Sequence, residues 1–303
     1  MTETNLFKTL DDAAELNILI LGCSGMLGSS LFHQIPKISP NYKVYGTSRG
    51  GSKVPVETDR AKILTLGNIF DSKALIDIFE TYKIDVVINA IGLIKQISGE
   101  LTKADFVKIN AWLPHYLMEM CDDFGARFIE ISTDCVFTGD KGNYTESDQS
   151  DAKDIYGVTK LLGEVTDNLN ALTIRTSIIG HESGRAASLI DWFLSTSGAV
   201  QGYKKAIFSG FPTVYLSQII GYYILPNKSL HGLYHVSANP IDKFTLLSLV
   251  AEAYNHNIDI TPNTEIIIDR SLNSNKFRKL TGFVPPTWNE LVRAMMTNRP
   301  IWK

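Results

Sequence analysis

The stretch from Asn17 to Gly28, which reads NILILGCSGMLG, decides the fold that we expect for this chain. It begins with four consecutive apolar residues, typical of a short buried strand, and continues with three glycines at a spacing of three. Gly22 would allow the tight turn out of the strand, Gly25 a close approach of the backbone to a pyrophosphate, and Gly28 close packing of the next helix on the sheet. The helix N-terminus would present free N–H groups to the phosphates. The stretch therefore predicts a dinucleotide-binding turn; the plain alternative is an ordinary strand-turn-helix connection.

The composition is that of a globular protein that acts on small ligands. The 303 residues are 44% hydrophobic and 20% charged, with a formal net charge of −3. This near balance argues against nucleic acid or an anionic membrane as the main partner, because both favour a basic excess. The three cysteines, Cys23, Cys121 and Cys135, lack disulfide or metal-site spacing, and no apolar run approaches the length of a membrane span. We therefore expect a cytoplasmic protein with no nucleic-acid partner, no membrane and no metal.

Short apolar runs that favour strands alternate with amphipathic runs that favour helices up to residue 177. The run from Val86 to Ile88 has no polar position, as in a parallel strand that helices cover on both faces. This alternation predicts an α/β fold with a doubly wound parallel sheet of the Rossmann type. The predicted strands are 18–21, 43–46, 63–66, 85–90, 127–131 and 172–176, and the predicted helices are 26–34, 71–82 and 101–122.

The predicted organisation is a dinucleotide-binding domain with a smaller C-terminal lobe. Residues 16–177 form the dinucleotide-binding domain, and 231–238 return to its sheet as a last strand. Residues 178–230 and 239–303 are less regular and are broken by glycine and proline, so we expect them to form a substrate-binding lobe. Within that lobe we predict helices at 185–197, 244–254 and 288–296 and a strand at 265–269.

The residues at the end of the second predicted strand bear on the choice of cofactor. In dinucleotide folds this place lies about 20 residues past the glycines and reaches the adenine ribose. Here it holds Ser48 and Arg49 and no acid, whereas a carboxylate would bond the 2′-hydroxyl of NAD and repel a 2′-phosphate. Hydroxyl and guanidinium donors suit that phosphate, so NADP(H) is favoured over NAD(H). The plain alternative is a solvated loop arginine beside Gly50 and Gly51.

Three residues with catalytic chemistry follow the fifth predicted strand. Thr133 lies at the carboxyl edge of the strands, where open α/β sheets place their sites. Tyr156 comes 23 residues later (156 − 133), and the four-residue spacing to Lys160 puts both on one helix face. A free tyrosine has a pKa of about 10. A lysine ammonium one turn away, with a cationic nicotinamide ring, would bring that pKa toward working pH. We predict that Tyr156 exchanges a proton with a substrate carbonyl that Thr133 orients, although an isolated Y-x-x-x-K motif is usually a surface helix.

These motifs together resemble those of extended short-chain dehydrogenases/reductases. The glycine pattern, the strand end from Asn89 to Gly92, the triplet Ser132-Thr133-Asp134 and the Tyr156-x-x-x-Lys160 motif carry the likeness. Within that superfamily, residues 16–298 are similar to the dTDP-4-dehydrorhamnose reductase group of sugar-nucleotide reductases, through the segments 132–137 and 174–177. The resemblance implies a nucleotide-sugar substrate, the catalytic set Thr133, Tyr156 and Lys160, and a homodimer as the assembly to be tested.

The resemblance also assigns cofactor contacts along the chain. Cys135 departs from the group, where tyrosine is often found, and Asn68 stands where an adenine-side acid is common in the superfamily. No obvious pair of glutamates matches the metal known at some dimer interfaces of the group. The expected contacts are Gly22, Ser24, Gly25, Met26, Leu27 and Gly28 at the pyrophosphate, Ser48, Arg49, Asn68 and Ile69 at the adenosine, and Ala90, Ile91, Gly92, Tyr156 and Lys160 at the inner ribose and nicotinamide.

The substrate side is predicted from fewer signals. Cys135 lies two residues past Thr133 and projects toward the substrate if the segment stays extended, and His181 follows the sixth predicted strand. The two resemble the cysteine and histidine with which GDP-fucose synthases move a proton beside a keto group; the plain alternative for Cys135 is a small buried hydrophobe. Candidate pyrophosphate-binding cations, each alone more often a solvated side chain, are Lys95, Arg185, Lys204, Lys205 and Arg270.

Three functional interpretations follow from the sequence. The first is an NADPH-dependent reductase of a nucleotide-linked 4-keto-6-deoxy sugar, in deoxysugar and cell-surface polysaccharide biosynthesis. The second is a bifunctional keto-sugar epimerase and reductase that uses Cys135 and His181. The third is a non-catalytic NADP-binding regulatory subunit, like the reductase-like partner of methionine adenosyltransferase, and the intact Thr133, Tyr156 and Lys160 weigh against it.

Overall fold

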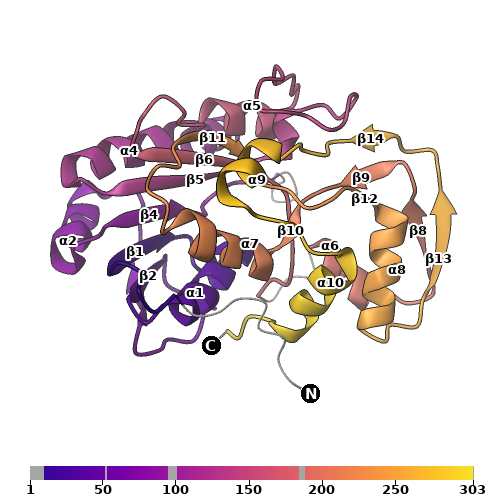
Figure 1. The fold of residues 1–303 in the computed structure, drawn as a ribbon, viewed down its shortest axis with the longest axis horizontal. Coiled ribbons are helices and arrows are strands. Elements are labelled where there is room, and N and C mark those ends of the chain that lie inside the picture. The colour runs from indigo at the N-terminus through magenta and orange to yellow at the C-terminus, as the bar shows by residue number, and fades with distance from the viewer. Residues whose placement is uncertain (1–9, 52, 95–100, 184–187, 303) are drawn as a thin grey trace.

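A single sheet of seven parallel strands dominates the part of the chain that the computed structural model describes, residues 10–51, 53–94, 101–183 and 188–302 (Figure 1). The strand order, β11-β6-β5-β4-β1-β2-β3, contains the order of doubly wound dinucleotide-binding sheets. The predicted fold class is confirmed. The strands are β1 (Leu16–Leu21), β2 (Tyr42–Ser48), β3 (Ala61–Thr65), β4 (Val86–Asn89), β5 (Arg127–Thr133), β6 (Ala171–Thr176) and β11 (Gly232–His235).

The connection from β1 to α1 (Met26–Ile38) is a turn with almost no room for side chains. Gly22 has a φ of +83°, and a Cβ on Gly28 would lie 2.1 Å from the Gly22 carbonyl oxygen. Both positions therefore require glycine. The first turn of α1 carries no acidic residue and no side-chain cap, so its N–H groups stay available to an anion.

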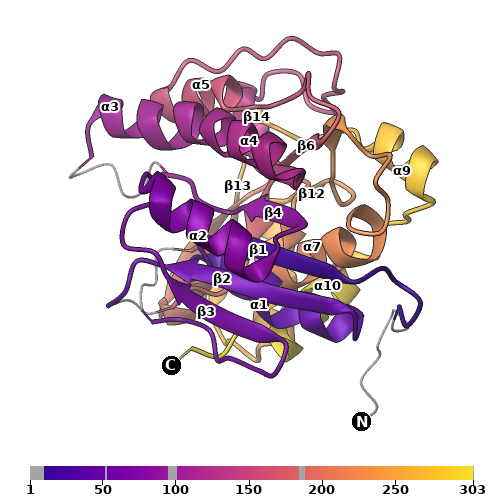
Figure 2. The ribbon, with the colours of Figure 1, turned by 90° about the vertical axis from the view of Figure 1, so that its left-hand side faces the viewer.

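Helices cover both faces of the sheet, as Figure 2 shows. One core contains apolar side chains of α2 (Ser72–Tyr82) and α4 (Leu113–Phe124), and the other contains those of α1 and α7 (Thr213–Ile219). The buried hydroxyls of Ser217 on α7 and Ser30 on α1 form a hydrogen bond of 3.0 Å. Although α7 falls in a range that we predicted for the lobe, it therefore packs with the dinucleotide-binding half, because its apolar face matches that of α1. The predicted domain boundaries otherwise stay a prediction.

The long helix predicted at 101–122 forms in three segments. They are α3 (Lys103–Phe106), a π-helical segment η2 (Val107–Trp112) and α4, and a capping box at Thr102 starts the first. Within η2, the buried Asn110 accepts a hydrogen bond from the Leu93 N–H at 2.8 Å and donates to the Leu93 carbonyl at 3.0 Å. This irregular turn therefore anchors the segment that follows β4, in keeping with the frequent use of π-bulges at functional sites.

The C-terminal lobe combines short strands with helices at the opposite end of the molecule from α2 (Figure 1). Its two small sheets are β13-β8 and β12-β9-β14, and α8 packs against them. Short strands β7 (Ile178–Ile179) and β10 (Phe211–Pro212) pair with each other and pack against α7. The other elements are β8 (Ala199–Tyr203), β9 (Ala206–Phe208), β12 (Ile241–Asp242), β13 (Asp259–Asn263), β14 (Ile268–Asp269), α6 (Leu189–Ser195), α8 (Lys243–Ala253), α9 (Asn275–Thr281) and α10 (Trp288–Thr297).

The lobe is also where predicted and observed elements differ most. The strand predicted at 265–269 shortens to β14, whereas β13, which contains Pro262, has no counterpart among the predicted elements. β13 pairs with β8 in parallel over residues that are 60 positions away along the chain (259 − 199). Because proline lacks an N–H and usually marks a strand edge or a turn, a local pattern gives no signal for such a strand.

Candidate active site

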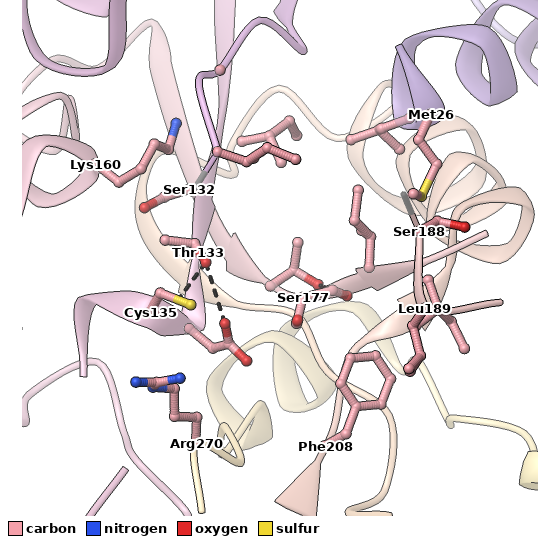
Figure 3. A pocket seen from close by; sticks show the side chains of 18 of the residues that line it. Met26, Ser132, Thr133, Cys135, Lys160, Ser177, Ser188, Leu189, Phe208 and Arg270 are labelled. Carbon is pink, nitrogen blue, oxygen red and sulfur yellow. Dashed lines mark hydrogen bonds between the residues drawn. The ribbon is translucent and has the colours of Figure 1, made fainter. Parts of the chain in front are cut away.

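A cavity of about 580 Å³ lies at the carboxyl ends of the strands and is closed on one side by the lobe. Figure 3 shows Thr133 and Cys135 at the end of β5, with Met26 from the start of α1 and Arg270 from the lobe also lining the cavity. The site therefore lies where open α/β sheets place their ligands. The lining also includes Ala90, Ile91, Gly92, Asp134, Tyr156, Lys160, Ser177, Phe208 and Lys243.

Thr133 and Tyr156 are brought together by two neighbouring segments. Thr133 is the last residue of β5, and its side chain lies close enough to that of Tyr156 to lower the pKa of the phenol. Tyr156 lies in the first turn of α5 (Ile155–Leu162), which the Asp154 carboxylate caps through the N–H groups of Tyr156 and Gly157 at 3.1 Å each. A Cβ on Gly157 would lie 2.3 Å from the Cys135 carbonyl oxygen. The absence of that side chain lets α5 approach the end of β5 closely.

The environment of Tyr156 keeps its hydroxyl protonated. Burial raises the pKa of the phenol strongly, and the nearby Cys135 and the carboxylates of Asp134 and Asp154 raise it further. The neighbouring Thr133 side chain acts in the opposite direction and lowers the pKa of Tyr156. The motif alone predicts a tyrosine tuned toward neutrality by Lys160, whereas burial and neighbouring anions dominate here. A protonated phenol is the form that donates a proton to a carbonyl oxygen.

Lys160 is held by a carboxylate that no sequence motif assigned. Its Nζ donates to Oε1 of Glu130 at 2.7 Å, and both side chains are buried, with 5% and 1% of their surfaces exposed. The Asn89 amide donates to the other oxygen of Glu130, also at 2.7 Å. Burial raises the pKa of Glu130, and the Lys160 ammonium and the Asn89 hydrogen bond oppose that rise. Lys160 therefore enters the cavity wall already paired with an anion.

The predicted cofactor residues divide into two groups. Gly25, Met26, Leu27, Ala90, Ile91 and Gly92 line the cavity, and the uncapped N-terminus of α1 with the bare turn at Gly22 and Gly28 makes a cradle that fits a pyrophosphate. Ser48, at the end of β2, is buried, and Arg49 is exposed beside it. The Asn68 side chain accepts from the Phe70 N–H at 3.0 Å and so shapes its own turn. Gly22, Ser24, Gly28, Ser48, Arg49, Asn68 and Ile69 lie outside the cavity lining.

The substrate side of the cavity carries cations from the lobe. Arg270 lines the cavity, and its Nε donates to the Phe137 carbonyl at 2.8 Å. The Lys243 ammonium lies over the aromatic ring of Phe208, 4.4 Å from the ring centroid. Burial raises the pKa of the nearby Asp134, and Arg270 and Lys243 both oppose that rise. Two cations of the lobe therefore line the cavity near Asp134, beside the end of β5.

His181 does not join Cys135 at the cavity, contrary to the predicted pair. Cys135 lines the cavity, whereas the buried His181 is absent from the lining. The His181 ring nitrogens meet Asp191 Oδ1 at 2.5 Å and the Tyr254 hydroxyl at 2.8 Å. Those contacts hold the imidazole within the lobe, because α6 and the end of α8 both supply partners for it. Lys95 and Arg185 lie outside the described residues.

Two residues of the site, Glu130 behind Lys160 and Lys243 in the cavity lining, could not be assigned from their motifs. Glu130 did carry a signal: it is an acid in the otherwise apolar run Phe128-Ile129-Glu130-Ile131 of a buried strand, and a buried carboxylate needs a partner. Lys243 carried none, because it directly follows the helix-capping Asp242 and reads as an ordinary surface cation. Among the described residues, no group of three or more His, Cys, Asp and Glu side chains is arranged to hold a metal ion. In the same part of the chain, no helix combines the length and apolar character that crossing a membrane requires.

The sheet order, the glycine turn and the cavity with its threonine, tyrosine and lysine define an NAD(P)-dependent oxidoreductase of the extended short-chain dehydrogenase/reductase type. More specifically, the chain belongs to the family described as RmlD substrate binding domain, whose model matches residues 16–300. This family membership confirms the predicted resemblance to the dTDP-4-dehydrorhamnose reductase group.

Several known proteins are similar to this chain. The chain is 27% identical to the spore coat polysaccharide biosynthesis protein SpsK of Bacillus subtilis (strain 168), over 93% of this chain and 97% of SpsK. It is 25% identical to the dTDP-4-dehydrorhamnose reductase of Aggregatibacter actinomycetemcomitans, over 74% of each chain. The crystal structure of dTDP-4-dehydrorhamnose reductase from Bacillus anthracis str. Ames in complex with NADP shares the fold, with a TM-score of 0.75, 20% identity and coverage of 94% of this chain and 99% of that one.

Proposed function

We propose that this protein reduces the 4-keto group of a nucleotide-linked 4-keto-6-deoxy sugar with NADPH, in the manner of dTDP-4-dehydrorhamnose reductase. The observation that carries the proposal is the contact between Thr133 and Tyr156 in a cavity that also contains Lys160. The cavity joins the cofactor cradle of α1 to the cations of the lobe, so a bound sugar carbonyl and a bound cofactor would meet there. The product would serve the biosynthesis of deoxysugars and cell-surface polysaccharides.

In the proposed mechanism, Tyr156 is the general acid. When bound, NADPH supplies the hydride that adds to the carbonyl carbon. The Tyr156 hydroxyl donates its proton to the carbonyl oxygen, while Thr133, whose side chain lies beside Tyr156, orients that oxygen. Lys160 lies on the same helix face as Tyr156, from which its ammonium can donate to the hydroxyls of the cofactor's inner ribose. The raised pKa of Tyr156 suits this direction of reaction, because the acid must be protonated before it can donate.

The preference for NADPH over NADH rests on the end of β2. Ser48 and Arg49 occupy the place that reaches the adenine ribose, and no carboxylate of that segment opposes a 2′-phosphate. The exposed Arg49 guanidinium would meet the phosphate at the rim of the cradle. The homodimer and the cytoplasmic location stay predictions.

We further propose that reduction proceeds without epimerisation. Cys135 is placed to contact the sugar, but His181 is held by Asp191 and Tyr254 outside the cavity lining. The second acid or base that epimerisation requires is therefore not supplied by His181. In D₂O with oxidised cofactor and keto sugar, mass spectrometry should find no enzyme-dependent deuterium at the carbons beside the carbonyl. Exchange that disappears in Cys135→Ser would contradict this part of the proposal.

The experiment that tests the proposed function is a substrate panel. Nucleotide-linked 4-keto-6-deoxy sugars with different nucleotides would be supplied with NADPH, and its consumption followed by absorbance, with NADH in parallel. At least one keto sugar should be reduced, and Tyr156→Phe, which keeps the cavity shape, should not support that turnover. If no keto sugar of the panel is reduced although the protein binds NADPH, the proposed substrate class is wrong.

A further inference from the structure

The ion pair between Lys160 and Glu130 lies one helical turn from the proposed catalytic tyrosine. Lys160 is one helical turn from Tyr156, and Glu130 lies on β5, three residues before Thr133. The two side chains are nearly fully buried and their contact is 2.7 Å. A buried ion pair is costly to assemble and is weak evidence for a role in stability. Its place beside the proton donor points to a role in the reaction.

Glu130 also connects Lys160 to the backbone that follows β4. Asn89 is the register partner of Glu130 on the neighbouring strand, and its side-chain amide donates to the Glu130 carboxylate. The side-chain oxygen of Asn89 in turn accepts from the Ile91 N–H at 3.1 Å, and Ile91 lines the cavity. One carboxylate therefore positions the lysine of α5 and, through Asn89, the segment predicted to contact the inner ribose.

The electrostatic consequence depends on whether Lys160 acts alone or as half of a pair. An uncompensated ammonium near a phenol favours the phenolate and therefore makes the tyrosine a stronger acid. A carboxylate 2.7 Å from that ammonium leaves the pair without net charge, so most of this effect is cancelled. A neutral pair keeps the donor of Lys160 in place without drawing the proton away from Tyr156.

We propose that Glu130 is a positioning residue that fixes Lys160 at the cavity wall and cancels its charge, so that Tyr156 remains a protonated acid at the pH of ketone reduction. The proposal rests on the proposed reductase function. It assigns the enzyme a built-in bias toward reduction, because the reverse oxidation needs Tyr156 as a phenolate base. Oxidation should become efficient only at a pH well above neutrality.

The other charged groups around the two side chains act in different senses on Tyr156 and on Glu130. Cys135, Asp134 and Asp154 face Tyr156 and raise the pKa of its phenol, after burial, which is the largest cause. Asp134 is itself faced by Arg270 and Lys243, which favour its charged form. The remaining charged group that acts on Glu130 is Glu164, which adds to the rise of the Glu130 pKa. Lys160 is the cation on the same helix as Tyr156, and its partner Glu130 sets how much of its charge is compensated.

The direct test is a spectroscopic titration of Tyr156 that does not depend on turnover. The complex with NADP⁺ would be titrated by the ultraviolet absorbance of tyrosinate for the wild type and for Glu130→Gln, and the curve of each protein's Tyr156→Phe version would be subtracted. In Glu130→Gln, the Lys160 charge is uncompensated, so the Tyr156 midpoint should fall by about 1 to 2 pH units relative to the wild type. An unchanged midpoint would mean that Glu130 is a structural brace only, and the proposal would be wrong.

Two further measurements protect the test against a failure to fold and against a wrong substrate. Glu130→Asp keeps the charge but withdraws it by one methylene, so its midpoint should fall by a smaller amount than that of Glu130→Gln. If Glu130→Gln is not folded even with NADP⁺, an unchanged midpoint in Glu130→Asp overturns the proposal and a lowered one supports it. Once a keto sugar is found, the high-pH limb of kcat should move down with the midpoint. If the Tyr156 midpoint shifts in Glu130→Gln but the enzyme reduces no keto sugar, the proposed role of Glu130 stands and the proposed substrate class is wrong.

Discussion

The two walls of the cavity are built in different ways. On the dinucleotide side, the backbone sets the geometry: Gly28 packs against Gly22, and Gly157 packs against Cys135, at distances that exclude a Cβ. On the lobe side, the wall consists of side chains, among them Phe208 and Arg270, that reach the cavity from short strands and the segments beside them. The cofactor half should therefore tolerate few substitutions, whereas the lobe can change its ligand contacts without disturbing the sheet.

Because the two walls differ, substitutions in them should have different effects on binding and on stability. A side chain added at Gly28 displaces α1 and should weaken cofactor binding. One added at Gly157 displaces α5 and thereby moves the proton donor. Both changes should also lower the stability of the fold. A change at the lobe cations alters the affinity for the sugar nucleotide and leaves the cofactor site intact. Four substitutions test this division.

Replacing Tyr156 by phenylalanine should have the largest effect on the reaction. Loss of a general acid lowers turnover by about 10² to 10⁴, and the phenyl ring keeps the packing of α5 on β5. We expect kcat to fall by that factor while the NADPH dissociation constant, measured by cofactor fluorescence, changes little. Turnover close to that of the wild type would show that another group donates the proton.

Gly28→Ala should test the backbone-built wall. The new Cβ would lie 2.1 Å from the Gly22 carbonyl oxygen, so α1 must move away from the turn. Overpacking of this kind typically costs about 1 to 3 kcal/mol of unfolding free energy, and we expect NADPH binding to weaken as well. Chemical denaturation and fluorescence titration measure the two effects.

The matched control for that substitution is Gly67→Ala. A Cβ on Gly67 would meet no atom within 4 Å, and the backbone there is not left-handed, so the change should leave both stability and NADPH binding close to wild type. If stability and NADPH binding fall equally in the two variants, the turn at Gly22 does have room for a side chain on Gly28.

Arg270→Gln should test the wall built from side chains. A hydrogen bond to a charged group contributes about 1.5 to 3 kcal/mol, so KM for the keto sugar nucleotide should rise about 10-fold or more. The NADPH dissociation constant should stay near its wild-type value, because Arg270 lies on the lobe side of the cavity. Lys204→Gln is the control, since Lys204 is a lobe cation over the Phe244 ring and outside the cavity lining. A similar rise of KM in both variants would indicate a general effect of lobe charge.

Arg49→Ala should have the smallest effect, confined to one cofactor. Arg49 is exposed, so its contact with a 2′-phosphate should be worth about 1 kcal/mol and weaken NADPH binding several-fold. NADH binding should not change, because NADH lacks that phosphate. Lys53→Ala removes another exposed cation of the same segment and serves as the control. If Arg49→Ala weakens NADPH and NADH binding equally, Arg49 does not contact the 2′-phosphate and contributes only to the loop.

Much of the cofactor half could be predicted from the sequence because its signals are local. The apolar run of β1, the glycines after it and the four-residue spacing of Tyr156 and Lys160 each depend on neighbours within a few residues. The helix at Ser72–Tyr82 begins after Asp71, as predicted, because that carboxylate accepts from the Ala74 N–H. Such patterns follow from strand and helix periodicity and from capping, which the local chain determines.

Only the tertiary structure decided which distant side chains share the cavity. It joined Glu130 to Lys160 and placed Lys243 and Arg270 beside Asp134, whereas it held His181 against Asp191 and Tyr254. The physical reason is that these contacts depend on how strands and helices pack, and a shift of one residue in register turns a side chain to the other face of a strand. The sequence by itself determined the class of fold and the order of the catalytic residues; packing determined the charges that surround them.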